Sequence, residues 1–138
     1  MKPEAGKKYS SIIYLASVLV ISIGSLVVLG WVMDIKILTT IKVDYASMKF
    51  NTAVAFILSG IMLYYCAKNK ESRVPIAVKM LAYIIFTIGA LTLTEDIFNY
   101  NAGIDELLMT DTEKSVAPVV YPGRMSTTAA ICFMLVAV

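Results

Sequence analysis

Acidic side chains gather in one stretch of this 138-residue chain, between two apolar segments. The stretch contains Glu95, Asp96, Asp105, Glu106, Asp111 and Glu113, and it closes with Arg124. Carboxylate oxygens bind small cations and accept hydrogen bonds from polar ligands. Two interpretations follow: a solvated acidic loop, or a small-cation or polar-ligand site formed by Glu95, Asp96 and Asp105.

Other chemistry has few candidate residues in this sequence. The chain has no histidine, which removes the phosphoacceptor of a histidine kinase, a serine-type triad and most zinc or haem ligation. Its seven glycines form no phosphate-binding pattern. A net charge of +2 is too small to indicate a nucleic-acid partner. We therefore predict no enzyme activity, no cofactor and no metal centre within these residues.

The elements that position the acidic stretch are apolar blocks. Hydrophobic residues make up 59% of the chain, charged residues only 16%, and the mean hydropathy is +0.78. A soluble domain is nearer half apolar and a quarter charged. Blocks with almost no charge indicate lipid as the solvent. We predict four transmembrane helices, at about residues 12–33, 50–67, 76–93 and 125–138.

The first and last blocks differ in length. Residues 12–33 carry no charge and reach about 33 Å as a helix, enough to cross a hydrocarbon core of about 30 Å. This block exceeds the usual core of a signal peptide and no cleavage site follows it, so we expect a retained helix. The last block reaches only about 21 Å. Because a chain end inside hydrocarbon is costly, we expect a truncated last helix in a fragment of a longer protein.

Lysine and arginine predict the orientation of the chain. An N-terminus in the cytoplasm gives outer loops at 34–49 and 94–124 and an inner loop at 68–75. The inner segments then hold seven bases in a short length: Lys2, Lys7, Lys8, Lys68, Lys70, Arg73 and Lys79. The outer loops are longer and hold the remaining five bases with most of the acids. By the positive-inside rule, the N-terminus is cytoplasmic.

Two stretches of the chain read alike. "MKFNTAVAFILSG" (Met48–Gly60) aligns with "MSTTAAICFMLVA" (Met125–Ala137) at a shift of 77, and each begins a helix that runs inward. "DIKIL" (Asp34–Leu38) also aligns with "GIDEL" (Gly103–Leu107) at a shift of 69. The pattern predicts an all-α membrane protein, a single membrane domain over residues 1–138, built as two parallel-repeated helix hairpins.

Both copies carry residues suited to begin and to pack a membrane helix. Ser47 or Asn51 could cap the first copy, and Ser126 or Thr127 the second. Small residues let helices approach closely in lipid. We expect helix packing at five of them: Ala55, Ser59, Gly60, Ala129 and Ala130.

Four segments together resemble a known family. These are "GWVMDIKIL", "MKFNTAVAFILSG", "FNYNAGIDELLM" and "PGRMSTTAAICFML", between about Gly30 and the end of the chain. They resemble the N-terminal polytopic membrane region of bacterial signalling proteins, where it precedes cytoplasmic PAS, histidine-kinase or diguanylate-cyclase modules. The sequence departs from the family at Ser126–Ala129, where Pro-Asn-Thr-Ala is frequent. The resemblance implies a bacterial inner membrane protein.

Three functions are compatible with these features. The first is a membrane-embedded input domain that relays a signal to an absent output module; its partners would be the bilayer, a second copy in a homodimer and an unknown small ligand. The second is a small oligomeric transporter or channel subunit, although the helix centres lack the ionisable residues typical of a transport pathway. The third is a structural membrane protein without a ligand. The residues that follow Val138 would discriminate among them.

Overall fold

The computed structural model describes residues 3–40, 47–69, 74–105, 109, 121 and 123–138. Within these residues the fold is all-helical. The helices are α1 (Pro3–Val32), α2 (Lys36–Thr39), α3 (Phe50–Lys68), α4 (Ile76–Ile97) and α5 (Thr127–Ala137).

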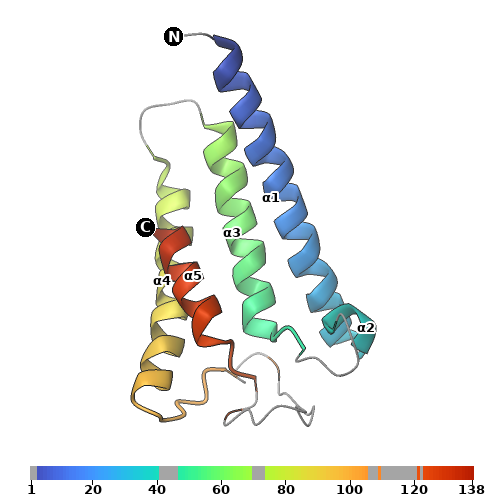
Figure 1. Cartoon of the computed structure of the whole chain (residues 1–138), viewed down its shortest axis with the longest axis vertical. Helices are drawn as coiled ribbons and strands as arrows, with labels where there is room; N and C mark the ends of the chain where they lie inside the picture. Colours follow the sequence, from blue (N-terminus) through green and yellow to red (C-terminus); the bar gives the residue numbers. More distant parts are fainter. Residues whose placement is uncertain (1–2, 41–46, 70–73, 106–108, 110–120, 122) are drawn as a thin grey trace.

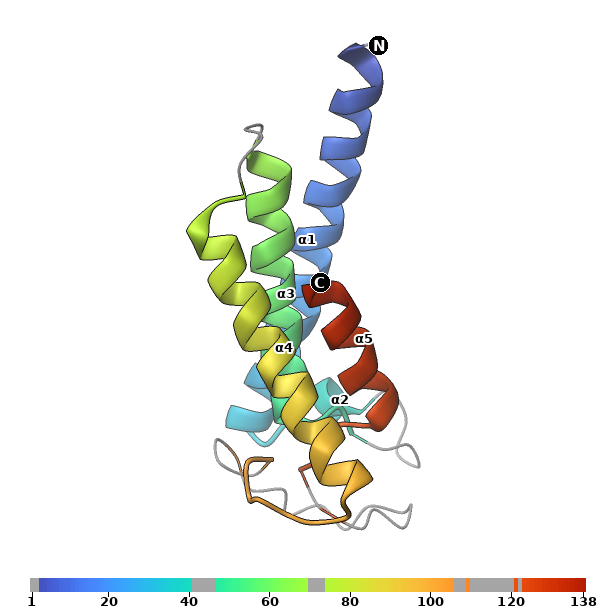
Figure 2. The ribbon, with the colours of Figure 1, turned by 90° about the vertical axis from the view of Figure 1, so that its left-hand side faces the viewer.

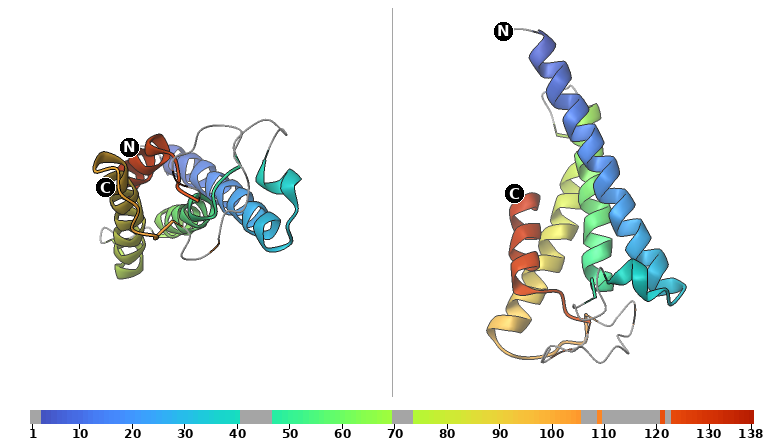
Figure 3. Two further views of the ribbon diagram at one scale, coloured as in Figure 1. Left: turned by 90° about the horizontal axis from the view of Figure 1, so that it is seen from below. Right: turned by 45° about the vertical axis from the view of Figure 1, so that its right-hand side comes forward.

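The four longer helices form two pairs (Figure 1). Helix α1 packs along α3, and α4 packs along α5. Helix α3 also contacts α4 and α5, and so joins the pairs. Helices α1 and α4 run in one direction and α3 and α5 in the other (Figures 1 and 3). We name the lower end of the bundle in Figure 1, where α3 and α5 begin, the loop end, and the opposite end the N-terminal end.

Three of the helices are long and apolar enough to cross a membrane. The spans are Ser10–Val32, Phe50–Lys68 and Ile76–Ile97. Large apolar side chains face outward along them; Tyr83, for example, is 74% exposed. Such extensive apolar exposure is typical of a lipid-facing surface and rare in water. Helix α5 is equally apolar but has only 11 residues, and it ends partway along the bundle (Figure 2).

The helix boundaries differ from the predicted ones at several points. Helix α1 begins at Pro3 rather than at residue 12, since proline is tolerated in a first turn. The predicted outer loop at 34–49 contains α2, which has too few residues to show a pattern. The predicted loop at 94–124 begins inside α4, which extends to Ile97 instead of ending at residue 93. The other boundaries agree within one or two residues, including the inner loop at 68–75 and the block at 125–138.

Each pair is held closely by a glycine in its first helix. A Cβ atom at Gly24 would lie 2.8 Å from the backbone oxygen of Ala53 in α3. A Cβ atom at Gly89 would likewise lie 2.8 Å from the backbone oxygen of Ala130 in α5. Gly60 meets α1 in the same manner, since its Cβ would lie 3.0 Å from the oxygen of Ser17. Only hydrogen fits at these positions, so the backbones nearly touch.

Small residues and aromatic rings fill the space between the pairs. Ala55 is fully buried in the core formed by α3, α4 and α5, and Ser59 is buried one turn further along α3. Ala129 is half-buried against the same core. The ring of Phe56 in α3 meets that of Phe133 in α5 edge-on, with the centroids 5.6 Å apart. Aromatic pairs prefer this geometry.

The two inward-running helices begin differently. Ser126 caps α5 by accepting a hydrogen bond from the Ala129 N–H at 3.2 Å, which confirms the predicted serine cap. Helix α3 begins after Lys49 without a capping side chain, so the cap predicted there is wrong. The amide of Asn51 instead donates to the backbone oxygen of Asp105 at 2.9 Å. That contact ties α3 to the second loop.

Helices α1 and α4 end in the same backbone motif. Asp34 (φ 55°) and Asn99 (φ 51°) adopt the left-handed conformation directly after the helices. The N–H of Ile35 then donates to the oxygen of Gly30, and the N–H of Tyr100 to that of Glu95. This is the Schellman motif, and Asn and Asp tolerate its left-handed position better than most residues. Of the predicted loop acids and the "GIDEL" segment, residues 106, 107, 111 and 113 lie outside the described residues.

Candidate functional site

The loop end carries a buried arginine just before α5. Gly123 adopts φ 77°, a conformation open to glycine, and the next residue is Arg124. Arg124 is only 8% exposed although it lies in a loop. A buried guanidinium needs partners for its N–H groups and its charge.

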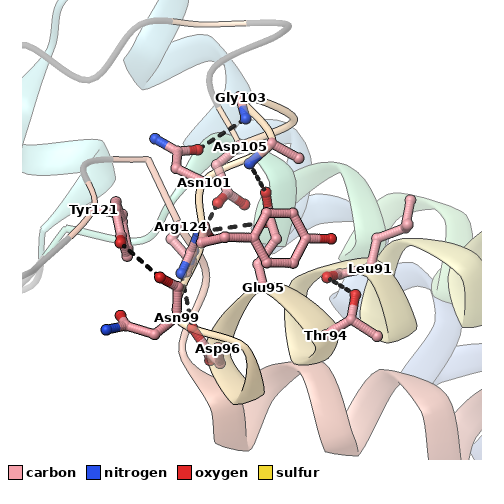
Figure 4. A network of polar contacts seen from close by, with 12 residues as sticks. Leu91, Thr94, Glu95, Asp96, Asn99, Asn101, Gly103, Asp105, Tyr121 and Arg124 are labelled. Atoms are coloured by element: carbon pink, nitrogen blue, oxygen red, sulfur yellow. Dashed lines mark hydrogen bonds and ion pairs between the residues drawn. The ribbon is translucent and has the colours of Figure 1, made fainter.

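Three carboxylates and one carbonyl surround the Arg124 guanidinium (Figure 4). Its Nε donates to Asp105 Oδ2 at 2.9 Å, and its Nη1 donates to Asp96 Oδ1 at 3.2 Å. Its Nη2 donates to the backbone oxygen of Tyr100 at 2.8 Å and lies 3.7 Å from Glu95 Oε2. We call Arg124, Glu95, Asp96 and Asp105 the Arg124 cluster. It joins the end of α4, the following loop and the start of α5.

An aromatic ring covers one side of the Arg124 cluster. The Arg124 Cζ lies 4.1 Å from the centroid of the Tyr121 ring, within the range of a cation–π contact. The Tyr121 hydroxyl donates to the backbone oxygen of Asn99 at 3.3 Å. Tyr121 therefore links Arg124 to the turn that ends α4.

Glu95 is the most deeply buried acid of the cluster, at 1% exposure. Its Oε1 accepts a hydrogen bond from the Ala102 N–H at 2.7 Å. Its Oε2 accepts no hydrogen bond within the described residues, and its ion pair with Arg124 is the longest of the three. The last full turn of α4 directs this carboxylate into the protein because Thr92 and Glu95 share the buried face of the helix.

Asp96 and Asp105 connect the cluster to neighbouring helices. Asp96, whose side chain is 22% exposed, accepts a 2.6 Å hydrogen bond from the Thr127 hydroxyl in the first turn of α5. Asp105 is 4% exposed, and its backbone oxygen receives the Asn51 amide of α3. One connected set of polar contacts therefore spans α3, α4 and α5.

The Arg124 cluster contains more acids than bases. Burial alone lowers the pKa of Arg124, but the hydrogen bond and charge of Asp105, followed by the charge of Glu95, raise the pKa above its ordinary value. The guanidinium is therefore a permanent positive charge around which the three carboxylates are arranged. A buried, hydrogen-bonded group of this kind is strongly destabilised when one partner is removed.

The predicted carboxylates do come together, but around an arginine. Glu95 and Asp105 are buried, so the interpretation as a solvated loop is wrong for these two. Within the described residues, no group of three or more His, Cys, Asp or Glu side chains could hold a metal ion. The central role of Arg124 was missed, as was that of Tyr121. An arginine that follows a run of acids and directly precedes an apolar helix was the available signal.

A cavity of about 440 Å³ lies beside the cluster, between the first turns of α3 and α5. We call it the loop-end cavity. Asp96 and Arg124 line one side with Thr127, and Lys49 and Thr52 belong to α3 and its N-terminal flank. Ser47, Met48, Tyr121, Met125, Ser126 and Ala129 complete the lining. The cavity offers charges of both signs and several hydroxyls to a small polar solute.

Comparison of this chain with protein-family profiles, curated proteins and solved structures finds no match.

Proposed function

We propose that this chain is the membrane-embedded input domain of a bacterial signal-transduction protein. It receives a signal at the loop end and passes a helix displacement to a cytoplasmic output module. The observation that carries the proposal is the Arg124 cluster, which joins α4, its loop and α5 through one guanidinium. A change at one carboxylate alters the contacts that hold α5 against α4. The resemblance of the segments from Gly30 onward supports the same function.

The proposed orientation puts the N-terminus in the cytoplasm and the loop end outside the inner membrane. The support is the distribution of bases, which are densest at the N-terminal end and in the segment between α3 and α4. Helix α5 is too short to cross the bilayer alone, at about 16 Å. In this arrangement it lies beside α4 as the fourth membrane helix, within the outer half of the bilayer.

We further propose that the α1–α3 and α4–α5 hairpins are two copies of one unit. Helices α3 and α5 begin after Lys49 and Ser126, which differ by the predicted shift of 77 and have nearly equal backbone angles. The oxygens of Ala53 and Ala130, related by the same shift, face Gly24 and Gly89.

The first helices of the two hairpins correspond at a shift of 65. That shift relates Gly24 to Gly89 and Gly30 to Glu95, and it relates Asp34 to Asn99 within the two Schellman motifs. It replaces the shift of 69 that the loop sequences indicated. Contacts shared at equivalent positions support an internal repeat more strongly than the alignment of two apolar stretches does.

The repeat would place the loop-end cavity between equivalent residues of the two copies. Phe56 and Phe133 are equivalent at a shift of 77, and their rings touch. The cavity is lined by four such pairs: Ser47 with Arg124, Met48 with Met125, Lys49 with Ser126, and Thr52 with Ala129. Sites at the interface of internal repeats are frequent in membrane proteins.

The proposed stimulus is a small polar solute in the loop-end cavity. Asp96 is the accessible acid of the Arg124 cluster and lines the cavity, whereas Glu95 and Asp105 are buried. A solute that binds Asp96 competes with Arg124 and Thr127 for its oxygens. Loss of these contacts loosens α5 from α4, which is the displacement that the proposal requires.

The native cysteines provide the test. Cys66 in α3 and Cys132 in α5 are free and exposed, so both can carry spin labels without substitution. The distance between the labels is measured by pulsed EPR with glycine and glycine betaine as probes. We expect at least one probe to shift the distance by about 1–2 Å, and Asp96→Asn to abolish the shift.

Asp34→Asn is the matched control, because Asp34 ends α1 outside the cluster and asparagine tolerates its backbone conformation. It should leave the response intact. An unchanged distance with every probe, together with an unchanged distance in Arg124→Gln, would overturn the proposal.

A further inference from the structure

A second cavity lies at the N-terminal end of the bundle, between α1 and α3. Its volume is about 460 Å³, and it is lined by Ser10, Ser11, Tyr14, Tyr64, Ala67 and Lys68. We call it the Tyr14–Tyr64 cavity. It is separated from the Arg124 cluster by the length of α3, so it is independent of the proposed input function.

The walls of this cavity are fixed by contacts between the two helices. The Ser10 hydroxyl donates to the backbone oxygen of Ala67 at 3.2 Å, which fastens the N-terminal third of α1 to the end of α3. One turn deeper, the rings of Tyr14 and Tyr64 pack with their centroids 5.6 Å apart. Hydroxyl groups therefore line the outer part of the cavity, and aromatic rings line the part nearer the bilayer centre.

One basic residue in the lining, Lys68, indicates that the cavity favours an anion. The Lys68 Nζ lies 6.0 Å from the centroid of the Tyr64 ring, at the limit of a cation–π contact. None of the described residues that line the cavity is acidic. A lysine ammonium has three donors and a positive charge, which suit a phosphate group.

The depth of the cavity identifies the source of the phosphate. Ser10 is the first residue of one candidate membrane span, and Lys68 is the last residue of another. The cavity therefore lies where the hydrocarbon ends and the lipid headgroups begin. Tyrosine is enriched at this depth, and lysine there extends its ammonium toward the headgroups.

We infer that the Tyr14–Tyr64 cavity binds the phosphodiester headgroup of an anionic phospholipid. The phosphate lies against the Lys68 ammonium at the cavity, whose walls the Ser10 hydroxyl holds together, and the acyl chains extend from it toward the bilayer centre. Basic pockets between membrane helices recognise lipids in this manner. The inference requires that the helices lie in a membrane. It does not depend on which side of the membrane the N-terminus faces.

Native mass spectrometry of the full chain in detergent tests the inference, with phosphatidylglycerol and phosphatidylcholine as probes. We expect selective retention of phosphatidylglycerol. Lys68→Gln should lower its bound fraction about fivefold, as expected for the loss of one interfacial lysine. Lys68→Arg keeps the charge and should retain the lipid.

The matched control is Lys79→Gln, because Lys79 is exposed on α4 near the same end and lies outside the cavity. It should leave retention unchanged. Equal retention of both lipids, no effect of Lys68→Gln, or an equal loss in Lys79→Gln would each overturn the inference. Displacement of the lipid by equimolar inorganic phosphate would also overturn it, since the site would then recognise the free anion. Should Lys68→Gln not fold, Ser10→Ala is expected to reduce retention, and an unchanged fraction would overturn the inference.

Discussion

The two hairpins have similar backbones but are closed at the loop end by different chemistry. In the α1–α3 pair, the Trp31 indole donates to the backbone oxygen of Met48 at 2.9 Å. In the α4–α5 pair, Asp96 accepts from Thr127 and from Arg124, which also binds Asp105. The described contact that closes the first pair is a neutral hydrogen bond, whereas a buried ion cluster closes the second. The comparison teaches that helix packing sets the shape of each pair. The closing contacts set how strongly its stability depends on charged side chains.

The largest expected loss of stability comes from removing the positive charge of Arg124, which closes the α4–α5 pair. Arg124→Gln leaves three carboxylates without a cation, two of them buried, and should lower the free energy of unfolding by about 3–5 kcal/mol. Steric trapping or thermal denaturation in detergent measures the loss. The double variant Arg124→Gln with Asp105→Asn should lose less than Arg124→Gln alone, because one unpaired charge is gone.

Lys79→Gln, which changes an exposed base outside the cluster, should stay near the wild-type stability. If Arg124→Gln costs no more than this control, the ion cluster does not close the second pair, and the contrast between the hairpins is lost.

An intermediate loss of stability is expected when the glycine at the close helix contact of each hairpin is replaced. Gly24→Ala and Gly89→Ala each introduce a Cβ atom 2.8 Å from a backbone oxygen, and the backbone cannot move aside cheaply. Each should lower stability by about 1–3 kcal/mol, although alanine gains about 1 kcal/mol in helix propensity. The same denaturation measurement should give similar losses for both. Ser25→Ala, beside Gly24, is the control and should have little effect. A large loss in one hairpin only would argue against equivalent packing.

The smallest loss of stability is expected when the Trp31 hydrogen bond of the α1–α3 pair is removed. Trp31→Phe keeps an aromatic ring but removes the indole N–H, so it should cost about 1 kcal/mol. Ser126→Ala, which removes the cap of α5, should cost a similar amount, about 1 kcal/mol. Thermal denaturation of both variants beside Arg124→Gln ranks the three. A loss in Trp31→Phe as large as that in Arg124→Gln would contradict the difference between the hairpins.

The sequence was informative where a structure depends on neighbouring residues. Long apolar runs predicted α1, α3 and α4, because length and hydropathy are local properties. The continuation of α4 to Ile97 was not predictable in this way, since its last turn carries Glu95 and Asp96, which pair with Arg124 far along the chain. Helix α2, with four residues, has no period to detect.

The candidate site was likewise predictable only in its local features. Glu95, Asp96 and Asp105 were recognised as a group because they are the acids nearest the end of α4. The burial of Glu95 and Asp105 was not predicted, because it depends on Asn51 from α3 and on Arg124 from beyond the loop. Such contacts join residues far apart in the chain, and no local pattern reports them.

The order of the cluster in the chain has a consequence for biosynthesis. A ribosome makes residues from the N-terminus onward, so Glu95, Asp96 and Asp105 leave it before their only cation among the described contacts, Arg124. Uncompensated carboxylates resist burial in hydrocarbon. The end of α4 must therefore stay hydrated until Arg124 emerges, whereas Trp31 and Met48 can already have met. The nascent chain therefore forms its hairpins in order. The α4–α5 hairpin gains its closing contacts only after Arg124 has been synthesised.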